Sequence, residues 1–160
     1  DIEKKMADLF DIAQKRIARI ERITAVKTIN RKDGQTEYKM PETFSGLRRV
    51  WRDGKPTKRY RWKNGKLVIP ANDTATTIEV EFYKTPETIT DETGGDYEFE
   101  VSEDAAQLMP FYVAAQNLFA DLMIDYTPYL NEWEKGLAEL ERIAQSQDQI
   151  GFTNTFYRSE

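Results

Sequence analysis

The sequence contains no cysteine and no histidine. Disulfides, zinc–thiolate sites, cysteine nucleophiles and Ser–His triads are therefore impossible within its 160 residues. The sequence also lacks an apolar run of the roughly 20 residues that a membrane-spanning helix needs. Gly94-Gly95 is not followed by the Lys-Ser/Thr of a phosphate-binding loop. We therefore expect no enzymatic activity, no cofactor, no metal site and no membrane contact, although the 39% of hydrophobic residues is enough for a folded core.

Helix-forming sequence lies at both ends of the chain. Over residues 1–22, apolar side chains recur at spacings of three and four, which predicts an amphipathic helix. Residues 102–147 predict two further helices. Ser102 is typical of an N-cap and begins one short turn. Pro110 indicates the start of the main helix, and Thr127-Pro128 indicates the start of a second helix.

The middle of the chain is rich in β-branched residues and tight-turn dipeptides. Asp53-Gly54 and Asn64-Gly65 are hairpin signals. Apolar and charged residues alternate from Thr77 to Tyr83 and again from Tyr97 to Val101, as they do in half-buried strands. We therefore predict an α+β fold, with a helical lobe formed by both ends of the chain (1–22 and 102–147), an inserted small antiparallel β lobe (23–101) and a C-terminal tail (148–160).

The net charge of −5 conceals two segments of opposite sign. Basic residues dominate from 45 to 66, and the candidate basic patch for subunit contact is Arg48, Arg49, Arg52, Lys58, Arg59 and Arg61. Acidic residues dominate from 71 to 104, and the candidate acidic patch is Glu79, Glu81, Glu98 and Glu100. Complementary patches on one chain favour head-to-tail contact between copies. A glycosidase pair or a calcium site is the less favoured interpretation of these carboxylates, because ordinary antiparallel strands also carry polar residues on one face.

The last residues of the chain are polar but include large aromatic side chains. A disordered terminus is normally depleted of such residues. We therefore consider two interpretations, a segment that orders against a partner and a tail that folds back on its own domain. The residues that would carry the docking are Ile150, Phe152, Phe156 and Tyr157.

Three stretches of sequence together resemble the head–tail connector proteins of tailed phages, which are also called adaptor or head-completion proteins. The stretches are Tyr-Arg-Trp-Lys-Asn-Gly-Lys-Leu-Val-Ile-Pro at 60–70, Glu-Phe-Tyr-Lys-Thr-Pro at 81–86 and Leu-Met-Pro-Phe-Tyr-Val-Ala-Ala at 108–115. The resemblance implies a helical core with a β insertion, without catalytic residues or cofactors.

The resemblance also implies partners and a location. Copies would form a homo-oligomeric ring, typically of twelve, that sits beneath the portal protein in the neck of the virion after assembly in the host cytoplasm. The C-terminal segment would dock on the portal, and tail or neck completion proteins would attach below. Overall negative charge would suit a channel in which DNA makes only non-specific contact and slides, because phosphate contacts supply most non-specific affinity.

A second class of function is a nucleic-acid or carbohydrate-binding module. Trp51, Tyr60 and Trp62 are interleaved with the basic residues of the β lobe, which is the composition of a face that binds single-stranded nucleic acid or sugar. The simpler interpretation is that the aromatic side chains pack inward. The acidic composition of the whole chain also disfavours nucleic-acid binding.

Overall fold

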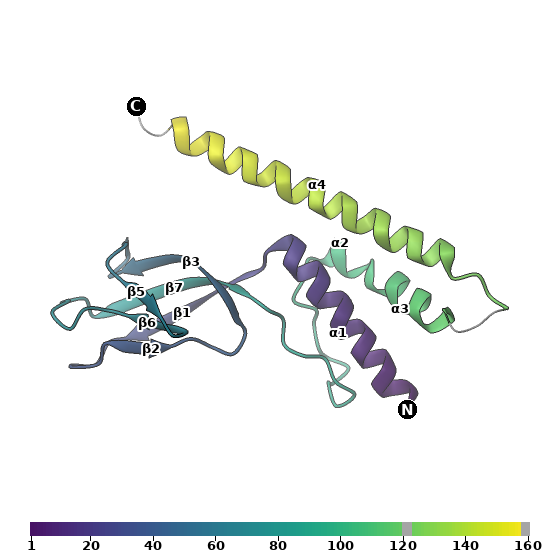
Figure 1. The fold of residues 1–160 in the computed structure, drawn as a ribbon, viewed down its shortest axis with the longest axis horizontal. Helices are drawn as coiled ribbons and strands as arrows, with labels where there is room; N and C mark the ends of the chain where they lie inside the picture. The colour runs from purple at the N-terminus through teal and green to yellow at the C-terminus, as the bar shows by residue number, and fades with distance from the viewer. Residues whose placement is uncertain (120–122, 158–160) are drawn as a thin grey trace. The chain divides into compact units, whose positions relative to one another are not determined.

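The computed structural model describes the backbone of residues 1–119 and 123–157, and the side chains of residues 1–119 and 123–147. The chain forms two compact units (Figure 1). One combines Asp1–Arg22 with Pro86–Glu160, and the other is Ile23–Thr85. The predicted α+β fold is confirmed: N-terminal and C-terminal helices pack together, and an antiparallel β region is inserted between them.

The helical unit contains α1 (Ile2–Glu21), α2 (Glu103–Ala106), α3 (Met109–Leu118) and α4 (Thr127–Tyr157). The Asp1 carboxylate caps α1 by accepting a hydrogen bond of 3.0 Å from the Glu3 N–H. Ser102 caps α2 as expected, because its hydroxyl accepts a hydrogen bond of 3.3 Å from the Ala105 N–H. Pro110 lies in the first turn of α3, where its missing N–H costs little.

The core of the helical unit lies where α1, α3 and α4 contact one another. Trp133 of α4 is fully buried, and its ring lies 5.0 Å from that of Tyr112 in α3, centroid to centroid. Gly136 lets α4 approach closely, because a β-carbon there would lie 2.4 Å from the Cδ2 atom of Leu108. The other buried apolar residues include Ala13, Ile17, Ala18, Ala105, Met109, Val113, Ala115 and Leu137.

The β unit contains two antiparallel sheets. One has the order β1 (Thr24–Asn30), β7 (Thr77–Lys84), β3 (Phe44–Arg52) and β4 (Lys55–Pro56), and the other has the order β2 (Glu37–Lys39), β6 (Lys66–Val68) and β5 (Arg61–Lys63). Both predicted hairpin turns are present. Asp53 and Gly54 have φ angles of 46° and 78°, and Asn64 and Gly65 have 50° and 73°, as a two-residue hairpin loop requires.

Residues from both sheets surround one core. Ile78, Val80 and Phe82 of β7 are almost fully buried, whereas Glu79 and Glu81 between them are half-buried, which confirms the predicted alternation. The core is made by Ile29, Tyr38, Met40, Val50, Leu67, Ile69, Ala75, Ile78 and Val80.

The boundary predicted at residue 101 differs from the structure. Residues 86–101 group with the helical unit, and the inserted unit ends at Thr85. The predicted strand at Tyr97–Val101 is also wrong, because this segment pairs with no strand. Its aromatic side chains contact helix α1 instead: the Phe99 ring lies 6.0 Å from that of Phe10, centroid to centroid, and the Tyr97 hydroxyl accepts a hydrogen bond from Gln14.

The C-terminal boundary differs as well. The sequence predicts a tail outside any helix from residue 148, but α4 is helical from Thr127 to Tyr157. Residues 158–160 lie outside the described part of the chain. At 31 residues α4 is about 46 Å long.

Candidate partner-binding surfaces

Polar side chains of α1 hold the segment that precedes α2. The Gln14 side chain is fully buried. Its Oε1 accepts a hydrogen bond of 2.8 Å from the Glu100 N–H, and its Nε2 donates one of 3.0 Å to the Tyr97 hydroxyl. Burial and the nearby Glu100 carboxylate raise the pKa of Tyr97, although the hydrogen bond with Gln14 opposes them. The hydroxyl therefore stays protonated and can donate to Glu100.

The same helix holds the segment at a second point. Asp11 accepts a hydrogen bond of 3.0 Å from the Ile89 N–H. Lys15 donates to Asp11 at 2.7 Å and to the Thr88 hydroxyl at 3.0 Å. Because these bonds replace the ladder that a strand would have, the segment is ordered although it belongs to no sheet.

Residues 87–98, here called the acidic loop, carry negative charge without any cation. Their carboxylates belong to Glu87, Asp91, Glu92, Asp96 and Glu98, all of which are exposed. Two backbone hydrogen bonds close turns in the loop, from Thr93 N–H to the Thr90 carbonyl (3.0 Å) and from Tyr97 N–H to the Gly94 carbonyl (3.1 Å). The loop is thus a compact, negatively charged projection of the helical unit.

The four residues of the predicted acidic patch are not on one strand face. Glu79 and Glu81 are on β7, whereas Glu98 and Glu100, predicted to lie in the β lobe, are in the helical unit. Glu100 is engaged within its own unit, since it accepts a hydrogen bond of 2.7 Å from the Glu87 N–H. Only Glu98 keeps an exposed carboxylate of the kind that a partner could reach.

Part of the predicted basic patch is used within the β unit. Arg48 forms an ion pair with Glu81 across β3 and β7. The guanidinium of Arg49 lies 5.7 Å from the centre of the Trp51 ring. These contacts neutralise or cover part of the positive charge on β3.

Arg52 and Arg59 converge on one buried carboxylate. The Asp73 side chain is 1% exposed, and its Oδ1 lies 2.7 Å from Nε of Arg52 and 3.6 Å from Nη1 of Arg31. Nε of Arg59 lies 3.9 Å from its Oδ2. Oδ1 also accepts a hydrogen bond of 2.8 Å from the Ala75 N–H.

This environment changes the acidity of Asp73. Burial acts to raise the pKa of the carboxyl, but the hydrogen bond from the Ala75 N–H and the Arg52 and Arg59 guanidinium groups lower it by more. The net pKa is below the ordinary value, so Asp73 is ionised at neutral pH. Sequence reasoning counted Asp73 as one acidic residue among many, because no spacing in the sequence brings it near its arginine partners.

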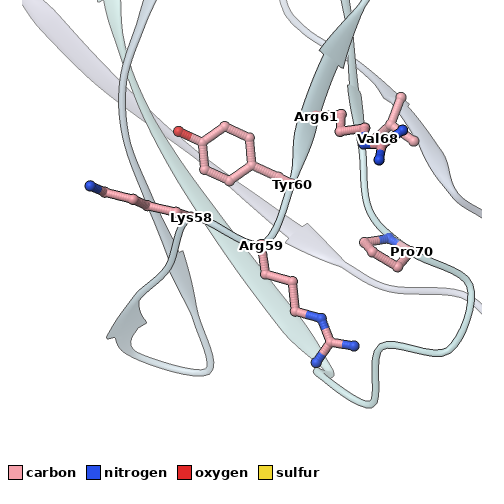
Figure 2. A pocket seen from close by; sticks show the side chains of 6 residues that line it. All are labelled: Lys58, Arg59, Tyr60, Arg61, Val68 and Pro70. Carbon is pink, nitrogen blue, oxygen red and sulfur yellow. The ribbon is translucent and has the colours of Figure 1, made fainter.

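Lys58, Arg59 and Arg61 line a groove of the β unit, together with Tyr60, Val68 and Pro70; these six residues are here called the basic groove. Its volume is about 490 Å³. Figure 2 shows that the lining comes from the connection between β4 and β5, from β5 itself and from the end of β6. Lys58 and Arg61 have exposed side chains, and no hydrogen bond or ion pair to another described residue occupies their charges.

The aromatic residues of this region do not form a row of stacking faces. Trp51 is half-buried beneath Arg49. Trp62 is 41% exposed, but its ring stacks on Phe44 with the centroids 4.8 Å apart. A face that binds single-stranded nucleic acid normally offers several free rings in succession. The arrangement is therefore better suited to contacts with charged groups than to stacking.

The candidate docking residues at the C-terminus lie on the last turns of α4. The side chains of Ile150, Phe152, Phe156 and Tyr157 lie outside the described side chains, although their backbone is helical. In the preceding stretch of α4, from residue 138 to 147, no side chain is buried. Leu137 is thus the last buried residue of α4 for which a side chain is described.

Within the described ranges, 1–119 and 123–157, no group of three or more Asp or Glu residues could hold a metal ion. None of the helices in these ranges is long and apolar enough to cross a membrane.

The fold is α+β: helices from both chain ends form one unit, a β unit is inserted between them in the sequence, and the long C-terminal helix continues past its last described buried residue. This is the architecture implied by the resemblance to phage connectors. A family model described as SU10 adaptor protein matches residues 1–155. The chain belongs to the SU10 adaptor protein family and is a phage adaptor, or head–tail connector, protein. No curated protein matches the chain.

Proposed function

We propose that this adaptor is the repeating subunit of a ring, of about twelve copies by the resemblance to connectors, between the portal protein and the tail. The family gives the structural role, and partners among phage assembly proteins follow from it. The virion neck is the location proposed for the ring. Tail or neck completion proteins are proposed to bind the side of the ring opposite the portal.

The long C-terminal helix is the observation that carries the proposal. Helix α4 is 31 residues long, yet its described side chains after Leu137 are all exposed or half-buried. Ile143 leaves 42% of its surface to solvent. A helix that continues for several turns past its own core needs a partner or strong local propensity to stay formed. The aromatic residues near its end, Phe152, Phe156 and Tyr157, supply apolar area for such a partner.

The proposed partner of this helix is the portal protein. Removal of residues 149–160 should abolish recruitment of the adaptor to portal rings, measured by co-sedimentation. The fold should persist, because every described core residue lies before residue 138. Removal of residues 158–160 alone is the matched control and should leave recruitment unchanged. Full recruitment of the longer truncation would contradict the assignment of the docking segment.

The ring itself is tested by electron microscopy of the purified protein, alone and mixed with portal rings from the same genome. Closed rings, or an added layer on the portal, are the expected result. We also propose that the ring lines the channel through which DNA passes. The net charge of −5 supports this, because a negative wall limits non-specific adhesion to phosphates. Monomers in both samples would contradict the proposal.

A further inference from the structure

We infer that the acidic loop of one copy binds the basic groove of a neighbouring copy. The inference rests on the proposed ring and goes further, because it names the two surfaces that meet. The helical unit of one subunit would thereby contact the β unit of the next. A contact of this kind is heterologous, so each copy uses both surfaces and the chain of contacts can close into a ring.

The first support is charge complementarity. Residues 58–66 include five basic residues and no acidic residue: Lys58, Arg59, Arg61, Lys63 and Lys66. In the acidic loop, every charged side chain is a carboxylate. Complementary charge orients two surfaces and disfavours other pairings, since like charges repel.

The second support is that several of these charges have no ion-pair partner, although Arg59 pairs with Asp73 and Lys66 pairs with Glu37. Among the described residues, Lys58, Arg61, Asp91, Glu92 and Glu98 make no ion pair, in contrast to Arg48 and Arg52. The predicted patches therefore separate into two groups. Arg48, Arg52 and Glu81 stabilise the β unit, and the groove and the loop keep charge available for another molecule.

The third support is that the acidic loop is held in one conformation before it binds. Asp11, Gln14 and Lys15 attach its ends to α1, and backbone hydrogen bonds close its turns. A loop that is already ordered loses little conformational entropy on association. The groove offers apolar contact as well, since Tyr60, Val68 and Pro70 line it beside the cations.

Charge reversal on each surface tests the inference. The groove variant carries Lys58→Glu and Arg61→Glu, and the loop variant carries Asp91→Lys, Glu92→Lys and Glu98→Lys, so that the net charge of each surface changes sign. Each should weaken self-association about tenfold, measured by sedimentation velocity at low salt, because several exposed charge pairs become repulsive. The matched control is Lys32→Glu with Lys55→Glu, two exposed residues outside the groove, which should associate like the wild type.

Combining the substitutions of both variants in one chain gives a sharper result. The groove then carries two carboxylates and one arginine, and the loop carries three lysines and two carboxylates, so the two surfaces again have opposite sign. This five-reversal chain should therefore associate more tightly than either variant alone. Failure of the five-reversal chain to recover association, with both single-surface variants folded, would overturn the inference.

Cross-linking tests the contact even if rings need the portal as a template. The chain has no cysteine, so one variant with Lys58→Cys and another with Glu92→Cys each carry a single thiol. On mild oxidation of an equimolar mixture, the mixed dimer should exceed the half of all dimers that random pairing gives, and 0.5 M salt should reduce the excess because it screens the attraction. A mixed dimer that makes up half of all dimers or less would contradict the proposed contact.

The outcomes separate this inference from the proposed function. If wild type and both charge variants add equally to portal rings, the ring proposal stands and the groove–loop contact is wrong. If the wild type neither self-associates nor adds to portal rings, both are wrong. A duplex DNA fragment is the third probe: loss of its binding in the groove variant, with association unchanged, would assign the groove to nucleic acid and overturn the inference.

Discussion

Replacement of Asp73 by asparagine should destabilise the β unit. The carboxylate is buried, accepts hydrogen bonds from the Ala75 N–H and from Arg52, and lies near the largely buried side chain of Arg31. Asparagine has nearly the same volume but no charge, so the positive charges of the neighbouring arginines are no longer balanced. Arg31 also donates to the Asp73 carbonyl at 2.6 Å, so the same cluster fixes the connection between β6 and β7.

The expected size follows from the burial of the partners. Breaking a buried ion pair costs roughly 3–5 kcal/mol. The Arg52 and Arg59 side chains are 32% and 56% exposed and can regain water. We therefore expect a loss of about 2 kcal/mol in the free energy of unfolding of the β unit. Asp91→Asn, in the exposed acidic loop, is the control and should change it by less than about 0.5 kcal/mol.

Hydrogen exchange followed by mass spectrometry is the suitable assay, because it reports the opening free energy of each unit separately. The amides of β3 and β7 should exchange faster in Asp73→Asn, whereas those of α1 should not change. An effect below about 0.5 kcal/mol on β3 and β7 would refute the argument that the cluster stabilises this unit.

Acid titration provides an independent test of the same carboxylate. Because the folded pKa of Asp73 is lowered, the unfolded chain binds its proton more tightly, and the contribution of Asp73 is complete above its unfolded pKa of about 3.9. This stability is lost as the pH falls through the lower, folded pKa. Between about pH 5 and pH 3, the wild-type β unit should therefore lose stability more steeply than the Asp73→Asn variant. Equal slopes would contradict the sign of the shift.

Two further predictions concern the helical unit. Gln14→Leu should cost about 2 kcal/mol, because it leaves the Glu100 N–H without its acceptor, and hydrogen exchange should accelerate in the acidic loop; Gln107→Leu, at an exposed position, should leave the loop unchanged. Gly136→Ala should lower the melting temperature although alanine favours helix, because its β-carbon would lie 2.4 Å from Leu108. The double variant with Leu108→Ala should be less destabilised than the sum of its single changes, and additive effects would show that the clash is relieved elsewhere.

The sequence alone was sufficient for the elements whose signals are local. The period of α1, the cap at Ser102, the position of Pro110 and the turns at Asp53-Gly54 and Asn64-Gly65 are all present in the structure. Such features depend on steric and hydrogen-bonding preferences of a few neighbouring residues, which do not need the rest of the fold. The resemblance of three stretches to phage connectors was likewise confirmed by the family match.

Tertiary structure decided what depends on partners distant in the sequence. The alternation at Tyr97–Val101 is typical of a strand, but periodicity cannot tell whether the backbone of this segment bonds to a strand or to a glutamine on a helix. The division of the basic residues is similar. In the sequence, nothing distinguishes Arg48 and Arg52 from Lys58 and Arg61. In the fold, Glu81 of β7 pairs with Arg48, and Asp73 pairs with Arg52. The charges of Lys58 and Arg61 have no such partner among the described residues and stay available for another molecule.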